Sequence, residues 1–188
     1  MTTATPSARE RLLNAANELF YDEGVHTVGI DRVIARAGVA KASLYNTFGS
    51  KEALVEAYLQ GRHRTTAERL TRGLERFDTP RERLLGVFTV QGERFGTPGF
   101  RGCAFASATA ECAPGGAVEH AADDYRTWIR ALFTGLAVEA GAVEPAALAH
   151  QLQLLYDGAA LSARMDHDPA AAVAARTAAA ALLDAASA

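Results

Sequence analysis

Cysteine, tryptophan and long apolar runs are scarce in this sequence of 188 residues. Only two cysteines, Cys103 and Cys112, are present, so we expect reduced thiols rather than a disulfide framework. No segment approaches the roughly 20 uncharged apolar residues of a membrane span. The first twelve residues lack the apolar centre of a secretory signal. These absences predict a soluble protein of the cytoplasm.

Sequence motifs of common catalytic and cofactor sites are also missing. There is no GxSxG, HExxH, GxGxxG or phosphate-binding loop, and the five histidines are scattered. Cys103, Cys112 and His120 do not have the spacing of a compact zinc site. We therefore expect no enzyme activity, no metal and no other cofactor.

Strand-like alternation of apolar and polar residues is absent over any useful length, which argues against a sheet. Apolar residues nevertheless make up 49% of the chain, enough for a packed core. Their helical spacing, interrupted by glycine and proline, predicts an all-α protein of about nine helices. Beyond the first 77 residues, the expected helices span about 81–95, 103–112, 118–140, 145–165 and 169–186.

Charge is distributed unevenly along the chain, although the net charge is only -3. Residues 1–64 contain eight Lys/Arg against seven acidic residues, whereas residues 65–188 contain eleven against fifteen. A slightly basic head on an acidic body is typical of a DNA-binding protein, but this difference is weak support.

The most informative segment is 28–54, VGIDRVIARAGVAKASLYNTFGSKEAL. Ile30, Val33, Ile34 and Ala37 have the spacing of one helix face. Gly38 then interrupts the pattern, as a left-handed helix terminus would require, and a second apolar phase follows. Two short helices joined by a glycine turn predict a helix-turn-helix, whose second helix enters the DNA major groove.

The flanking sequence predicts how this segment is framed. Ser7 and Glu10 match a capping box that starts a helix ending near Gly24. We expect a flexible tail at 1–6, a DNA-binding domain at 7–50 and a ligand-binding and dimerisation domain at 51–188, joined by a helix over 51–77. The expected small core of the head consists of Phe20, Ile34, Leu44 and Phe48.

Residues 8–60 resemble the DNA-binding head of TetR-type (TetR/AcrR) transcriptional regulators. The resemblance is carried by Ala37-Gly38-Val39 at the turn, Leu44-Tyr45 and Phe48 in the second helix, and Ser50-Lys51-Glu52 after it. It implies a homodimeric repressor that binds a palindromic operator and is released by a small-molecule effector. An activator of the same family is an open alternative, as is a helical interaction protein that does not bind DNA.

Within the head, candidate DNA contacts lie on or near the second short helix. An amide can pair bidentately with adenine, so Asn46 is the best candidate for base reading, and Ala42 suits a thymine methyl. The resemblance implies phosphate contacts by Tyr45 and Lys51; the alternative is that Tyr45 packs and Lys51 is a solvated charge. The complete set is Thr27, Lys41, Ala42, Ser43, Tyr45, Asn46, Thr47 and Lys51.

For the body, aromatic residues suggest an apolar or aromatic effector, although aromatic residues at helical spacing are more often core. Trp128 and Tyr156 are favoured because each adds a polar atom to an apolar wall. Cys103 follows Gly102 at an expected helix start beside Arg101, so it is either an electrophile or oxidant sensor or a small buried residue. The candidate effector site is Phe88, Cys103, Phe105, Tyr125, Trp128 and Tyr156.

The last two helices are expected to form the homodimer interface. Alanine lets helices approach closely, and leucines supply apolar area. Two-fold symmetry would then place two recognition helices on successive major grooves. The candidate interface residues are Leu148, Leu152, Leu155, Leu182 and Leu183.

Overall fold

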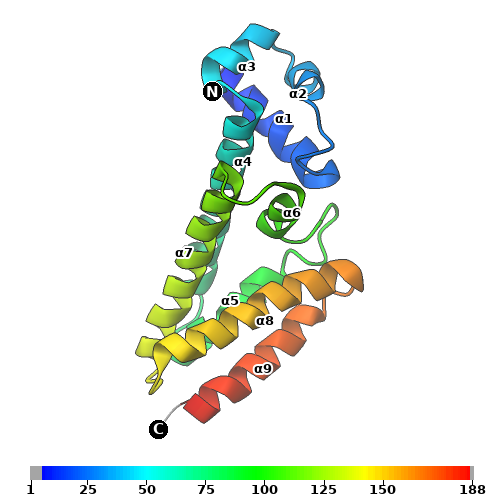
Figure 1. The fold of residues 1–188 in the computed structure, drawn as a ribbon. Helices are drawn as coiled ribbons and strands as arrows, with labels where there is room; N and C mark the ends of the chain where they lie inside the picture. Colours follow the sequence, from blue (N-terminus) through cyan, green and yellow to red (C-terminus); the bar gives the residue numbers. More distant parts are fainter. Residues whose placement is uncertain (1–5, 187–188) are drawn as a thin grey trace, which may run out of the picture. The chain divides into compact units, whose positions relative to one another are not determined.

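The computed structural model describes residues 6–186, and helices account for most of that range, without a β-strand. The all-α prediction is confirmed. Residues 1–5 of the predicted tail lie outside the described residues. The described helices (Figure 1) are α1 (Ala8–Glu23), α2 (Ile30–Ala37), α3 (Lys41–Phe48), α4 (Lys51–Leu74), α5 (Pro80–Gly92), α6 (Ala104–Glu111), α7 (Ala117–Glu139), α8 (Pro145–Met165) and α9 (Ala171–Ala186).

The helices form two compact units. The first, here called the head unit, comprises residues up to His63 together with 104–123, so α6 belongs with α1, α2 and α3. The second, the body unit, comprises 64–103 and 124 onward. Helices α4 and α7 contribute residues to both units.

Capping boxes define the starts of α1 and α5. The Ser7 hydroxyl accepts a hydrogen bond from the Glu10 backbone N–H, and the Glu10 carboxylate accepts one from the Ser7 N–H. Thr79 and Glu82 repeat this arrangement before α5, with Pro80 in its first turn. The hydrogen bonds from Ser7 and Thr79 lower the pKa values of Glu10 and Glu82.

Two helices end earlier than the sequence pattern predicted. Helix α4 stops at Leu74, and Phe77 turns back so that its ring lies against Gly86, at a site where a Cβ would be only 2.5 Å from Phe77 Cε2. Helix α5 stops at Gly92 rather than near Phe95, whose N–H closes a turn onto the Gly92 carbonyl at 2.9 Å. Apolar spacing alone extended both helices too far, because Phe95 is buried and Phe77 is half-buried from the turns that follow the helices.

The head core contains Phe20 and Leu44, as predicted. Ile34 and Phe48 are only half-buried, and the guanidinium of Arg9 lies over the Phe48 ring, 5.7 Å from its centroid. The interior is completed by residues outside the predicted set, including Leu12, Val28, Val33, Leu54 and Leu59.

In the body unit, α9 packs against both α8 and α5, and Figure 1 shows α8 and α9 side by side. Small residues permit this approach: a Cβ on Gly92 of α5 would lie 2.5 Å from the Cβ of Ala172 on α9. Leu148, Leu152 and Leu183 are buried inside this single chain. They were predicted at the dimer interface, and that assignment stays a prediction.

No helix within residues 6–186 combines the length and apolarity needed to cross a membrane.

Candidate nucleic-acid interface

The turn between α2 and α3 has the geometry that its glycine predicted. Gly38 adopts φ 62° and ψ 42°, the left-handed conformation, and its N–H donates to the Ala35 carbonyl at 3.3 Å. Arg11 of α1 donates from Nη1 to the Gly38 carbonyl at 3.1 Å. The turn that aims α3 is therefore fixed by its own backbone and by a side chain from α1.

Two arginines attach α2 to α1. Arg32 makes a bidentate pair with Glu23, at 2.5 and 2.8 Å, and Arg36 pairs with Glu18 at 2.6 Å. All four side chains are largely exposed, so each pair adds little to the free energy of unfolding. The pairs matter more for DNA binding, because a phosphate would have to compete with Glu23 and Glu18 for these two arginines.

Helix α3 exposes several of the residues that were predicted to contact DNA. Leu44 is fully buried and anchors the helix, whereas Ala42 and Asn46 are exposed and Tyr45 is 45% exposed. Ala40 provides no side-chain cap, as its methyl group predicts. Ser43 is half-buried, and the hydroxyl of Thr47 donates to the Ser43 carbonyl at 2.6 Å, within the same helix.

Lys41, at the start of α3, is held by an acidic neighbour. Its Nζ lies 3.0 Å from Asp31 Oδ1, on the first turn of α2. The hydrogen bond to Asp31 and the carboxylate charge raise the pKa of Lys41. Both side chains are exposed, so a DNA phosphate would compete with Asp31 for this ammonium group.

Lys51 and Thr27 lie near the turn that precedes α2. Lys51 is half-buried and donates from Nζ to the His26 carbonyl at 3.4 Å, while Thr27 is exposed. Val28 is fully buried and fixes this turn in the core. The side chains of Lys51 and Thr27 therefore both lie at the turn that precedes α2.

The same turn is held by α6. The carboxylate of Glu111, the last residue of α6, accepts a hydrogen bond from the His26 backbone N–H at 2.7 Å. Gly24 lies directly beside it, with φ 94°, and a Cβ there would be 2.6 Å from Glu111 Oε1. This contact was not predicted from the sequence, because 85 residues separate the partners.

Comparisons with known proteins agree with this geometry. Residues 12–58 match the family model described as bacterial regulatory proteins, tetR family. The crystal structure of a TetR-family transcriptional regulator from Streptomyces coelicolor superposes with a TM-score of 0.89 at 33% identity, covering 96% of each chain. The chain belongs to the TetR family. It is thus a transcriptional regulator with a helix-turn-helix DNA-binding domain.

Other TetR-family similarities are more local or more distant. The activator FasR of Mycolicibacterium smegmatis is 50% identical over 52 residues, which are 28% of this chain and 24% of FasR. The chain thus spans about a quarter of the length of this curated relative. The reduced form of Escherichia coli NemR is 25% identical with a TM-score of 0.82, covering 92% of this chain and 94% of NemR. These relatives confirm the expectation of a regulator rather than an enzyme.

The body unit of this TetR-family chain brings several predicted effector residues together. The rings of Phe88, Phe133 and Tyr156 lie 5.7–6.5 Å apart between centroids. The ring centroids of Tyr125 and Trp128 lie 6.1 Å apart, with the two rings tilted by 32°. Phe133 was absent from the predicted set, although it follows the same apolar stripe of α7.

Polar atoms interrupt this aromatic cluster. The hydroxyls of Tyr125 and Tyr156 lie 3.4 Å apart, and burial raises the pKa of both. Cys103 is half-buried and interacts electrostatically with both phenols. Phe105, also predicted here, is buried on α6 and belongs to the head unit. Within residues 6–186, no three His, Cys, Asp or Glu side chains group closely enough to hold a metal.

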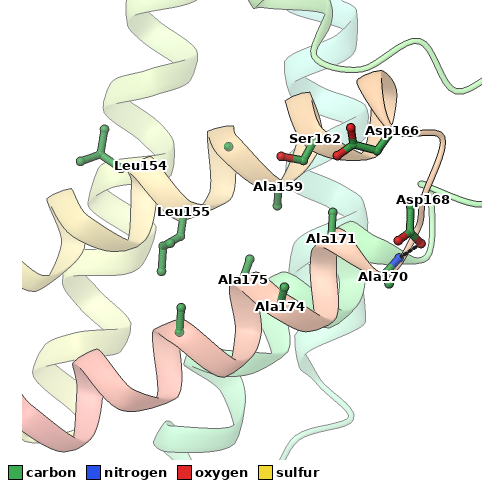
Figure 2. A pocket seen from close by; sticks show the side chains of 12 residues that line it. Leu154, Leu155, Ala159, Ser162, Asp166, Asp168, Ala170, Ala171, Ala174 and Ala175 are labelled. Carbon is green, nitrogen blue, oxygen red and sulfur yellow. Dashed lines mark hydrogen bonds between the residues drawn. The ribbon is translucent and has the colours of Figure 1, made fainter.

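A groove of about 510 Å³ runs between α8 and α9. Figure 2 shows side chains from both helices lining it, with Asp166 and Asp168 near the connection between them. Leu155, one of the predicted interface residues, lines the groove and is half-buried. Leu182 is also half-buried. The large apolar residues exposed on α8 are Leu154, Leu161 and Met165, which the predicted interface did not include.

Proposed function

We propose that this TetR-family regulator is a repressor that binds a palindromic operator as a homodimer and leaves it when a small-molecule effector binds the body. The observation that carries the proposal is the exposed edge of α3, anchored by buried Leu44 and oriented by the Gly38 turn. An eight-residue helix with one buried and one open face suits insertion into a major groove.

The proposed DNA contacts divide into two kinds. Asn46 and Ala42 read base edges, since both are exposed on the same side of α3. Phosphates are bound by Tyr45, Lys51, Thr27 and Lys41, which set the register of the head on the duplex. Ser43 and Thr47 stabilise this edge of α3, because the Thr47 hydroxyl donates a hydrogen bond to the Ser43 carbonyl.

Binding of the full chain to its own upstream DNA, measured by fluorescence anisotropy at several salt concentrations, tests the proposal. The expected result is saturable binding that weakens with salt. Lys51→Ala should reduce affinity for all sequences and lower the salt slope by about 1, the value for one phosphate contact. An absence of binding to any upstream fragment would instead favour a helical interaction protein without DNA function.

Asn46→Ala tests base reading separately. The variant should lose about 1–3 kcal/mol of discrimination at one operator position per half-site while keeping its salt slope. Asn14→Ala, which changes an exposed asparagine on α1, is the matched control. An unaltered sequence preference for Asn46→Ala would mean that Asn46 only faces solvent.

The proposed dimer interface is the open face of α8 and α9. Leu154, Leu161 and Met165 are 58–68% exposed and share one face of α8, at spacings of seven and four residues. The adjoining groove is lined mainly by alanine and glycine, which allow close helix packing. A second copy would cover this face by two-fold symmetry.

The proposed effector site is the aromatic cluster of the body unit. Phe88, Tyr125, Trp128 and Tyr156 provide apolar walls with a few polar atoms, which is typical of small-molecule sites. To release the operator, the effector must bind the DNA-free state more tightly than the DNA-competent state.

We infer a second candidate function, sensing of electrophiles or oxidants by Cys103. Its thiol is half-buried beside the buried phenols, and a structural relative, NemR, was solved in a form described as reduced. A thiol reagent should label Cys103 in the folded chain and lower operator affinity, whereas Cys103→Ser should resist the effect. Slow labelling without loss of operator binding would retire this function.

A further inference from the structure

Arg69 is an unusual cation inside the body unit. It lies on α4, is half-buried, and donates from Nη1 to the Val90 carbonyl of α5 at 2.6 Å. Within residues 6–186 it has no carboxylate at ion-pair distance, unlike Arg32 and Arg36 of the head. Its partial burial lowers its pKa. A charge removed from water is usually paired, so this guanidinium is suited to an anion supplied from outside the chain.

Gln91, the next residue after Val90, carries the complementary feature. Its side chain is only 4% exposed, and its Nε2 donates to the Tyr156 carbonyl at 2.8 Å. Its Oε1 is buried and accepts no hydrogen bond from the described chain. A buried amide oxygen without a donor is rare in folded proteins and needs an explanation such as a bound ligand.

The two tyrosines connect these groups to the aromatic cluster. Tyr156 receives the Gln91 bond on its carbonyl, and its hydroxyl lies 3.4 Å from that of Tyr125. The Arg69 charge interacts electrostatically with both phenols. Helices α4, α5, α7 and α8 therefore contribute a cation, an unpaired acceptor and two hydroxyls beside the Phe88 and Phe133 rings.

We infer that this region binds a hydroxylated aromatic carboxylate. Arg69 binds the carboxylate, the ligand hydroxyl donates to Gln91 Oε1, and the ring packs against Phe88 and Phe133. The inference rests on the proposed function, because it names the chemical class of the effector. It is more specific than an apolar or aromatic ligand, since an apolar molecule would leave the Arg69 charge without an anion and Gln91 Oε1 without a hydrogen-bond donor.

Titration calorimetry on the full chain tests this directly. The probes are para-hydroxybenzoate and para-hydroxyphenylacetate, each compared with its carboxamide, which keeps the shape and removes the charge. The carboxylates should bind about 10- to 100-fold more tightly than the carboxamides, as expected for hydrogen bonds to a charged group. Equal affinity within each pair, or no saturable binding of either carboxylate, would overturn the inference.

Two variants assign the contacts. Arg69→Gln should abolish the preference for carboxylate over carboxamide, and Arg72→Gln, at an exposed arginine one turn along α4, should leave it intact. Gln91→Met keeps the side-chain volume, and should weaken para-hydroxybenzoate binding without weakening binding of benzoate. This second comparison remains informative if Arg69→Gln does not fold. Undiminished preference in every folded variant would overturn the assignment.

Operator binding is measured in parallel without any probe. Carboxylate preference with no operator binding would reject the repressor function and leave the ligand class standing. Operator binding with no carboxylate preference would reject only the ligand class.

Discussion

Three cations of the head unit already have carboxylate partners in the absence of DNA. Arg32 and Arg36 are paired with glutamates of α1, and Lys41 is paired with Asp31. A DNA phosphate must therefore displace an internal carboxylate to use Lys41. We expect a modest salt slope for each head, because few ammonium or guanidinium groups are available for phosphate contacts.

Asp31→Asn should strengthen operator binding. The substitution removes a carboxylate 3.0 Å from Lys41 and leaves the ammonium group available to a phosphate. Since exposed ion pairs are weak, affinity should rise only a few-fold, and the salt slope should become steeper by about 0.9. Anisotropy titrations across a salt series measure both quantities.

A double-mutant cycle provides the control for this effect. In a Lys41→Ala background, Asp31→Asn should have no further influence on the salt slope, because the cation that it releases is gone. A gain that persists without Lys41 would show that Asp31 acts by general repulsion of DNA instead.

Some of these residue features could be read from sequence and others could not. Gly38 and the Ser7–Glu10 box follow local rules, and the structure reproduces both. The Asp31–Lys41 and Arg32–Glu23 pairs join different helices, so their formation depends on how those helices cross. The local sequence pattern contains no information about the crossing angle between two helices.

At the scale of helices, α6 is part of the head unit through Glu111. Its carboxylate accepts from the His26 N–H in the same turn whose carbonyl accepts from Lys51. Glu111→Ala should loosen this turn, because the His26 amide loses its acceptor. We expect faster hydrogen exchange at residues 25–29 and a local stability loss of about 1 kcal/mol.

Glu111→Gln is the matched variant, since its amide oxygen can still accept from His26. Exchange at this turn should remain close to that of the unmodified chain. Equal acceleration in both variants would indicate that charge, rather than the hydrogen bond, holds the turn.

Contact between α5 and α9 depends on the absence of one side chain. A Cβ at Gly92 would approach Ala172 Cβ to 2.5 Å, so Gly92→Ala should separate the helices and cost about 1–3 kcal/mol in unfolding free energy. Gly135→Ala in α7 is the control, because a Cβ at that position would meet no other atom within 4 Å. That change should stabilise the chain by about 0.5–1 kcal/mol. Chemical denaturation followed by circular dichroism measures both, and destabilisation by the two changes alike would contradict the packing argument.

Helix packing also bears on the predicted interface leucines. Leu148, Leu152 and Leu183 have the apolar spacing of a buried face, and they are buried. Periodicity reports that a face is covered, but not whether its own chain or a partner covers it. The buried Ala159 of α8 and Ala175 of α9 do not distinguish these two cases either, since small residues suit contacts within a chain as well as contacts between chains.

For the whole molecule, palindromic DNA binding requires two heads related by two-fold symmetry. The apolar stripe of Leu154, Leu161 and Met165 on α8 is left exposed by its own chain. Exposed apolar patches of this kind commonly mark protein interfaces. Dimer formation would double the few phosphate contacts of each head, which compensates for its paired cations.

Leu161→Glu should convert the dimer into a monomer and thereby weaken operator binding. Two-fold symmetry would bring two carboxylates into an apolar interface, where burial of unpaired charge is strongly unfavourable. Sedimentation at micromolar concentration should show the mass fall from twice the chain mass to 19.9 kDa. Val138→Glu, at an exposed valine of α7 outside the α8–α9 groove, should remain dimeric and bind DNA normally. A Leu161→Glu protein that stays dimeric would move the interface away from this face of α8, whereas a folded monomer with full operator affinity would separate DNA recognition from dimerisation.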